Sequence, residues 1–197
     1  MEVIAPPELH LMEGVFHHIY FKLLPTLDND QKELLNKSLR NKNIYPSRYH
    51  GGKYEGNEVR KILKSADMFL SPFVSTEYQH QLLDSLIKFD KVVHSCFATK
   101  LIPDYVTHIG NFQQSFILTG LSVTYKVHVV VSHIIDFINH YAEPGKGLGL
   151  VSEQAGESAH HKWIKYWEKF KLRMDHPQYP ERLELCLQDF TYDRLPI

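Results

Sequence analysis

The chain has 197 residues, of which 43% are hydrophobic and 23% charged, so it suits one globular domain with a sizeable core. Its net charge is -1 with all 13 histidines neutral, which excludes a general attraction of the whole chain to nucleic acid or to acidic membranes. The two cysteines form no CxxC pair, which excludes a disulfide framework and favours a reducing, intracellular setting.

Membrane association is not expected either. No apolar run approaches the roughly 20 residues that a membrane span needs. The amino terminus lacks the charged and apolar regions of a secretory signal. We therefore expect an intracellular protein without a membrane partner.

Apolar residues at helical spacing predict helices from the start of the chain. Two consecutive prolines, residues 6–7, precede the first helix, and Pro25 ends it. A second helix is expected over residues 30–39, with Asp28 or Asn29 as its cap.

Residues 32–64 form the one locally basic block, with nine Lys and Arg against three Glu. The block contains the glycine-rich turn HGGKYEGN, and a third helix is expected from near Asn57. It is either a solvated face or a surface that contacts the phosphates of nucleic acid. The residues that would make such contacts are Arg40, Lys42, Arg48 and Lys53.

Two longer helices are expected in the middle of the chain. Ser75 or Thr76 begins the first, which reaches Leu101. Asp104 begins the second, and Gly120 closes it.

Residues 121–141 are the most apolar segment, and their apolar positions share one face at helical spacing, which predicts one helix rather than a strand. His133, Asp136 and His140 lie together on its polar side. A glycine-rich loop follows, and the last helix is expected near residues 180–190.

Residues 148–172 predict a helix that combines acidic, imidazole, aromatic and basic side chains. Glu153, Glu157 and His160 share one of its faces, and these residue types hold a divalent cation or share a proton. An acidic first turn also suits the helix dipole, so a merely solvated face is the alternative.

The two polar faces can combine. If the glycine-rich loop folds the two helices back antiparallel, His133 and Asp136 join the acidic face in a cluster with metal-ligand character. A polar network of purely structural use produces the same sequence pattern.

Basic and aromatic residues alternate farther along the same predicted helix. Lys162, Lys165 and Lys169 have Trp163 and Trp167 between them, a pattern that can hold phosphates and stack on bases. The alternative places the tryptophans in the core and the lysines in solvent.

Four stretches, in this order, resemble a family of transposable-element-derived proteins from arthropod and cnidarian genomes. They are PPELHLMEG at residues 6–14, KYEGNEVRKIL at 53–63, YKVHVVVSHIIDF at 125–137 and GLVSEQAGESAHHKW at 149–163. The resemblance covers nearly the whole chain.

The resemblance implies the carboxy-terminal part of a DDE transposase, whose core is similar to a ribonuclease H fold and uses acidic residues with two Mg²⁺ or Mn²⁺ ions. Glu157 or Glu153 would match the last acidic position and act in catalysis. The strand that would carry the first acidic residue is missing upstream. We therefore expect a fragment of a larger protein, or a decayed copy, without autonomous catalysis. Its expected partners are DNA, another protein or the missing amino-terminal half.

The sequence thus predicts a mainly α protein, a single irregular helical domain of about seven helices over residues 1–197. Two functions stay open. One is a transposon-derived remnant of a metal-dependent phosphoryl-transfer nuclease, and the other is a non-catalytic helical module that binds DNA or protein. Both suit a nuclear rather than a cytoplasmic location.

Overall fold

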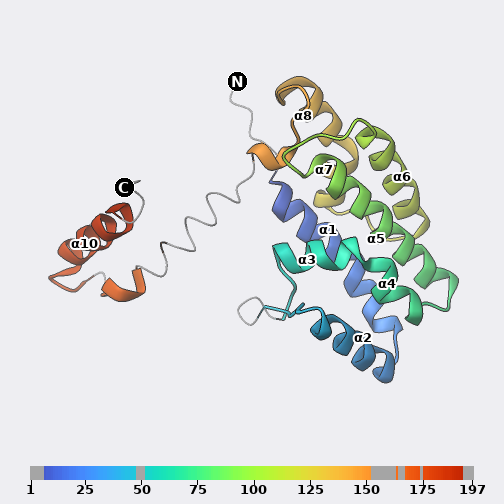
Figure 1. The fold of residues 1–197 in the computed structure, drawn as a ribbon, viewed down its shortest axis with the longest axis horizontal. Coiled ribbons are helices and arrows are strands. Elements are labelled where there is room, and N and C mark those ends of the chain that lie inside the picture. The colour runs from blue at the N-terminus through green and yellow to red at the C-terminus, as the bar shows by residue number, and fades with distance from the viewer. Residues whose placement is uncertain (1–6, 48–51, 152–162, 164–166, 174, 193–197) are drawn as a thin grey trace. The chain divides into compact units, whose positions relative to one another are not determined.

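The computed structural model describes residues 7–47, 52–151, 163, 167–173 and 175–192. The chain divides into two compact units, Met1–Ser152 and Glu153–Ile197. Among the described residues all regular secondary structure is helical, apart from one isolated β-bridge between Lys100 and Lys146 (Figure 1). The prediction of a mainly α protein is confirmed.

The number of helices differs from the prediction of about seven. Nine α-helices have both bounds within the described residues. The prediction was lower because α3 and α4, and likewise α7 and α8, are separate helices with no proline or glycine between them to mark the break. The helices are α1 (Glu8–Leu23), α2 (Asn29–Asn41), α3 (Gly56–Lys64), α4 (Ala66–Leu70), α5 (Glu77–Cys96), α6 (Tyr105–Leu118), α7 (Tyr125–Ser132), α8 (Ile134–Tyr141) and α10 (Tyr179–Tyr192), with 3-10 turns η1 (Leu24–Thr26), η2 (Ser71–Phe73) and η3 (Leu148–Val151). In the part of the chain that the structure describes, no helix is both long and apolar enough to cross a membrane.

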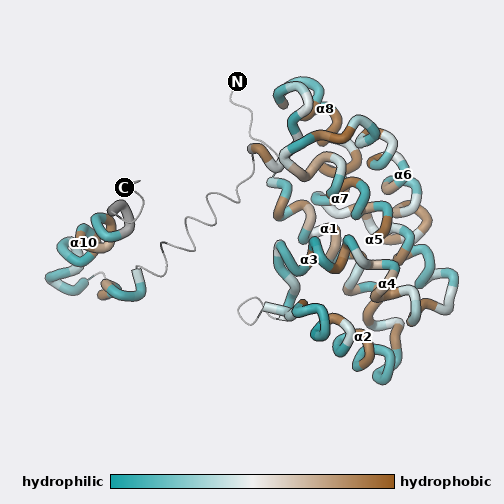
Figure 2. Tube along the Cα trace, in the orientation of Figure 1, coloured by the Kyte–Doolittle hydropathy of each residue, from teal (hydrophilic) through white to brown (hydrophobic). Residues whose placement is uncertain are grey.

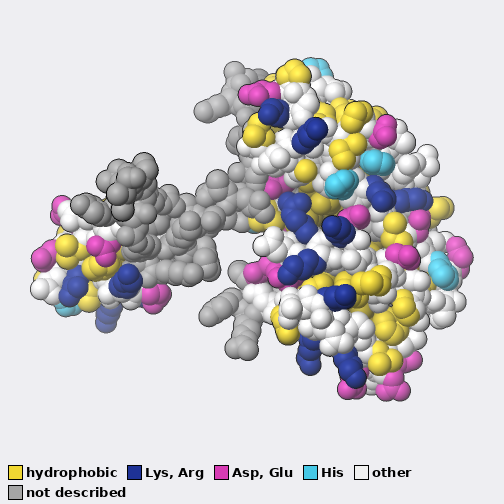
Figure 3. All heavy atoms as spheres, viewed as in Figure 1, with side chains coloured by type: hydrophobic (Ala, Val, Ile, Leu, Met, Phe, Trp, Pro, Cys, Tyr) yellow, Lys and Arg dark blue, Asp and Glu magenta, His cyan; other side chains and the backbone are white. Residues whose placement is uncertain are grey.

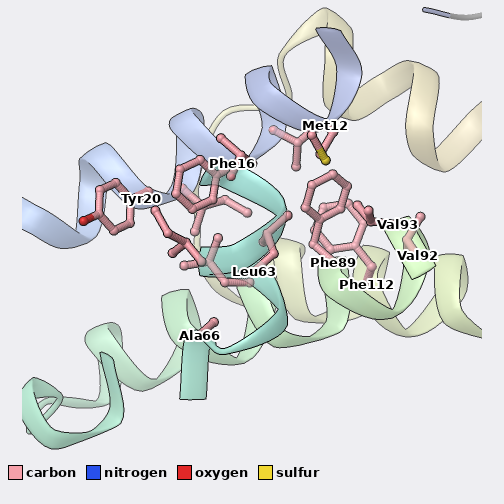
Figure 4. Close-up of a cluster of buried hydrophobic side chains, with 14 of the residues drawn as sticks. Met12, Phe16, Tyr20, Leu63, Ala66, Phe89, Val92, Val93 and Phe112 are labelled. Carbon is pink, nitrogen blue, oxygen red and sulfur yellow. The ribbon is translucent and has the colours of Figure 1, made fainter. Parts of the chain in front are cut away.

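The core of the first unit lies between α1, α5 and α6. Met12 of α1 lies beside Phe89 of α5 and Phe112 of α6, and all three side chains are fully buried (Figure 4). The rings of Phe89 and Phe112 are 5.0 Å apart between centroids. Burying one such side chain stabilises the fold by about 1.5–3 kcal/mol, so this cluster holds α1 against α5.

α2 lies at the edge of this core. Its buried residues are Leu35 and Leu39, one helical turn apart. Figure 2 shows the rest of α2 as mostly hydrophilic, which fits a helix with one narrow buried stripe.

The predicted caps of α2 and α5 are both present. Asp28 accepts the backbone N–H of Gln31, and Thr76 accepts that of Gln79. Each glutamine side chain in turn accepts the backbone N–H of its cap, which completes two capping boxes. Helix starts therefore follow from local sequence here.

The end of α5 differs from the prediction. The helix ends at Cys96 rather than at Leu101. The chain beyond Cys96 pairs with the glycine-rich loop: the N–H of Leu101 donates to Gly145 O (3.0 Å) and that of Gly147 to Thr99 O (3.1 Å). A tertiary contact thus replaces the last predicted helical turn.

The single helix predicted over residues 121–141 is wrong in detail. α7 begins after Thr124, and His133 separates α7 from α8 with φ -121° and ψ -22°. The break contains no proline or glycine, which are the residues that mark a helix end in a sequence. Hydrophobic periodicity alone therefore could not reveal it.

Aromatic side chains contact one another in the second unit. The rings of Trp163 and Trp167 are nearly parallel with centroids 6.3 Å apart, and Tyr179 meets Trp167 edge-on at 5.8 Å. α10 confirms the last predicted helix. Of the helix predicted over residues 148–172, the first four residues form η3, and the helical residues end at Phe170.

Candidate nucleic-acid interface

The predicted metal ligands are only partly described. Glu153, Glu157 and His160 lie outside the described residues, whereas His133 and Asp136 are described and exposed. Within the described ranges, no three His, Cys, Asp or Glu side chains stand close enough to hold a metal ion. Because Mg²⁺ and Mn²⁺ need several oxygen ligands, His133 and Asp136 alone do not fit such a centre, and no catalytic step follows from them.

The predicted phosphate contacts are also divided. The four that are described are all exposed, namely Arg40, Lys42, Lys53 and Lys169. The other three, Arg48, Lys162 and Lys165, lie outside the described residues.

Two carboxylates of α1 fix the chain around α3 to α1. The backbone N–H of Gly56 donates to Oε1 of Glu13 at 2.6 Å, and a guanidinium nitrogen of Arg60 lies 3.9 Å from Oε1 of buried Glu8. A hydrogen bond to an ionised acceptor is roughly twice as strong as a neutral one. These contacts hold the segment that carries Lys53 against α1.

α7 contributes a second lysine to the same part of α1. The side chain of Lys126 lies directly over Gly14, where a Cβ would collide with the lysine Cδ. Gly14 therefore leaves the space in which the apolar stem of Lys126 lies along α1.

His17, one turn after Gly14, lies near both lysines. Burial lowers the pKa of His17 below its ordinary 6.5, and the charges of Lys53 and Lys126 lower it further. A hydrogen bond with the Tyr54 backbone raises the pKa of His17 and so partly opposes these effects. Two cations from distant parts of the sequence thus lie within electrostatic reach of one half-buried imidazole.

Tyr54 lies within electrostatic reach of a third cation, Arg40. Its hydroxyl hydrogen-bonds with that of Tyr20, and burial is the main cause that raises the pKa of both phenols. The charge of Arg40 lowers the pKa of Tyr54, so the end of α2 also lies near this place.

We call the surface made of His17, Arg40, Lys53 and Lys126 the lysine face. Figure 3 shows Lys and Arg side chains gathered over α1 and α3 on one side of the first unit. Local accumulation of positive charge is the electrostatic feature that attracts phosphates, even where the net charge of the chain is -1.

Sequence reasoning missed two members of the lysine face. Lys126 stands alone in an apolar segment, so counting charges along the chain does not find it. His17 reads as a surface or core histidine of α1. Residues 6–14, 53–63 and 125–137 all contribute contacts here, Glu13 with Gly56 and Gly14 with Lys126, and no local signal in the sequence brings them together.

The comparisons with known proteins do not extend this picture: no protein-family model, no curated protein and no solved structure gives a significant match to the chain.

Proposed function

We propose that the chain is a non-catalytic helical module that binds the phosphate backbone of DNA through the lysine face. The observation that carries the proposal is that Lys126 lies over Gly14, one turn before His17, and that the charges of Lys53 and Lys126 both lower the pKa of His17. Cations brought together by the fold, rather than by sequence, make a local phosphate-binding surface in a chain of nearly zero net charge.

The neighbouring carboxylates favour this proposal. Glu13 already accepts the Gly56 N–H, Glu8 lies against Arg60, and Glu58 lies 3.6 Å from Lys61. Lys53 and Lys126 are in none of these contacts and stay available to phosphates. Contacts to phosphates carry no sequence information, so we expect binding through Lys53 and Lys126 that depends little on sequence.

Binding of labelled duplex DNA by the full chain in low salt tests the proposal. Lys53→Ala and Lys126→Ala should each weaken binding, because each removes one phosphate contact. Lys88→Ala is the matched control: it removes the same charge, but Lys88 is paired with Asp84 at 2.7 Å. Equal affinities for all three variants, or no binding by the wild type, would reject DNA in favour of a protein partner.

We keep the nuclease hypothesis as a second proposal, supported by the motif order and by the acidic residues Glu153 and Glu157. In it these residues would bind Mg²⁺ or Mn²⁺ as part of a larger transposase-like protein, and a nuclear location would follow. Calorimetric titration with Mn²⁺ of the wild type and of Glu157→Gln tests it. The hypothesis requires heat from the wild type that the variant lacks, and negligible heat from both would reject it.

A further inference from the structure

Two exposed imidazoles face each other where α7 ends and α8 begins. Nε2 of His128 and Nε2 of His133 are 3.1 Å apart. The ring centroids are 4.8 Å apart and the ring planes are nearly perpendicular, at 85°. The break at His133 accounts for the pairing, because residues five apart point to different sides of a continuous α-helix.

The distances describe converging nitrogens. Rings joined head to head by a straight N–H···N bond would have centroids separated by the N–N distance plus both centroid-to-nitrogen lengths, which exceeds 4.8 Å. For a symmetric pair, the two centroid-to-nitrogen lines meet about 2 Å beyond each nitrogen, the Zn–N distance in zinc sites. In that symmetric arrangement, loss of the proton between the two nitrogens would leave a pair with the shape of a bidentate chelate.

A neighbouring hydroxyl can accept a hydrogen bond from the tautomer that chelation needs. Oγ of Ser132 lies 3.4 Å from Nδ1 of His128. When Nδ1–H donates to this hydroxyl, the lone pair of His128 stays on Nε2, next to His133. Such support of a ligating imidazole from its second nitrogen is general in metal sites.

We propose that His128 and His133 form a binding site for a divalent transition ion of the Zn²⁺ class. Two imidazoles suit Zn²⁺, Cu²⁺ or Ni²⁺ and do not suit Mg²⁺. A tetrahedral ion held here keeps two positions for water or for ligands of another molecule. The proposal does not depend on DNA binding by the lysine face.

Calorimetric titration of the full chain with Zn²⁺ tests the site. His128→Ala and His133→Ala should each lose the same one equivalent of bound Zn²⁺, since a chelate needs both rings. His80→Ala, an exposed histidine of α5, is the matched control and should keep it, so that zinc bound at other histidines cancels in the comparison. Excess Mg²⁺ should not displace the ion.

Nitrogen NMR of the histidine rings supplies a second readout that does not rely on variants. One equivalent of Zn²⁺ should shift the Nε2 signals of His128 and His133 together, with the proton remaining on Nδ1 of His128. Unchanged stoichiometry in either alanine variant, an absence of zinc binding by the wild type, or Nε2 signals that do not shift together would overturn the proposal.

Discussion

His17 reports on the charges around it. Burial and then the two lysines lower its pKa, and its Nε2 is buried without a hydrogen-bond partner among the described residues. A buried nitrogen in this state favours the neutral ring. His17 is therefore a natural probe of the positions of Lys53 and Lys126.

Lys126→Ala should raise the pKa of His17 toward 6.5, because removing a nearby positive charge makes protonation easier. NMR titration of the His17 ring measures this directly. Lys88→Ala serves as the charge-matched control and should leave the His17 pKa unchanged. If both variants have the same effect, Lys126 does not lie where the structure places it.

The lowered pKa of His17 also makes stability depend on pH. The unfolded chain binds this proton near pH 6.5, whereas the folded chain binds it only at lower pH. The contribution of neutral His17 is complete above pH 6.5 and is lost as pH falls through the folded-state pKa.

We expect wild type to lose more unfolding free energy than His17→Gln between pH 7.5 and pH 5 in urea titrations, since the variant cannot bind this proton. Equal losses in the two chains would show that His17 has its ordinary pKa. The other histidines titrate in both chains and cancel in the difference.

At the scale of the elements, Gln79 joins two helices that are distant in sequence. Its side-chain oxygen accepts the backbone N–H groups of Ser75 and Thr76, and its amide nitrogen donates to the carbonyl and hydroxyl oxygens of Thr26. Gln79 is buried, so the start of α5 and the turn after α1 depend on it together.

Gln79→Ala should cost about 1–3 kcal/mol in unfolding free energy, because it leaves several polar groups without partners in a buried place. Gln31→Ala is the matched control, since Gln31 occupies the same capping-box position in α2 near solvent. We expect the control to cost about 1 kcal/mol or less. Equal costs in denaturant titrations would contradict a tertiary role for Gln79.

The bounds of a helix can be predicted from the sequence where neighbouring residues determine them, and not where a tertiary contact does. The caps of α2 and α5 were predictable because a capping box is local. The end of α5 and the break at His133 were not, because the first depends on a contact with Gly145 and Gly147 and the second has no proline or glycine.

The candidate site divides in the same way. Arg40 and Lys53 were predictable from a basic block that is continuous in sequence. Lys126 and His17 were not, because their roles come from the packing of α7 on α1 over Gly14. The acidic residues Glu153 and Glu157 stay predictions, outside the described residues.

At the scale of the whole molecule, the first unit contains the core cluster of α1, α5 and α6 and the lysine face. A chain that ends at Ser152 should therefore keep a cooperative unfolding transition with nearly the midpoint of the full chain. Circular dichroism during heating measures this. A truncated chain without a cooperative transition would show that residues 153–197 complete the fold of the first unit.

The salt dependence of DNA binding tests the central claim most directly. The logarithm of the DNA-binding constant should fall with the logarithm of the salt concentration. For the double variant Lys53→Ala with Lys126→Ala this slope should be shallower than for the wild type by about two, since each lysine neutralises one phosphate. Lys88→Ala should keep the wild-type slope. Identical slopes for the double variant and the wild type would contradict binding through the lysine face.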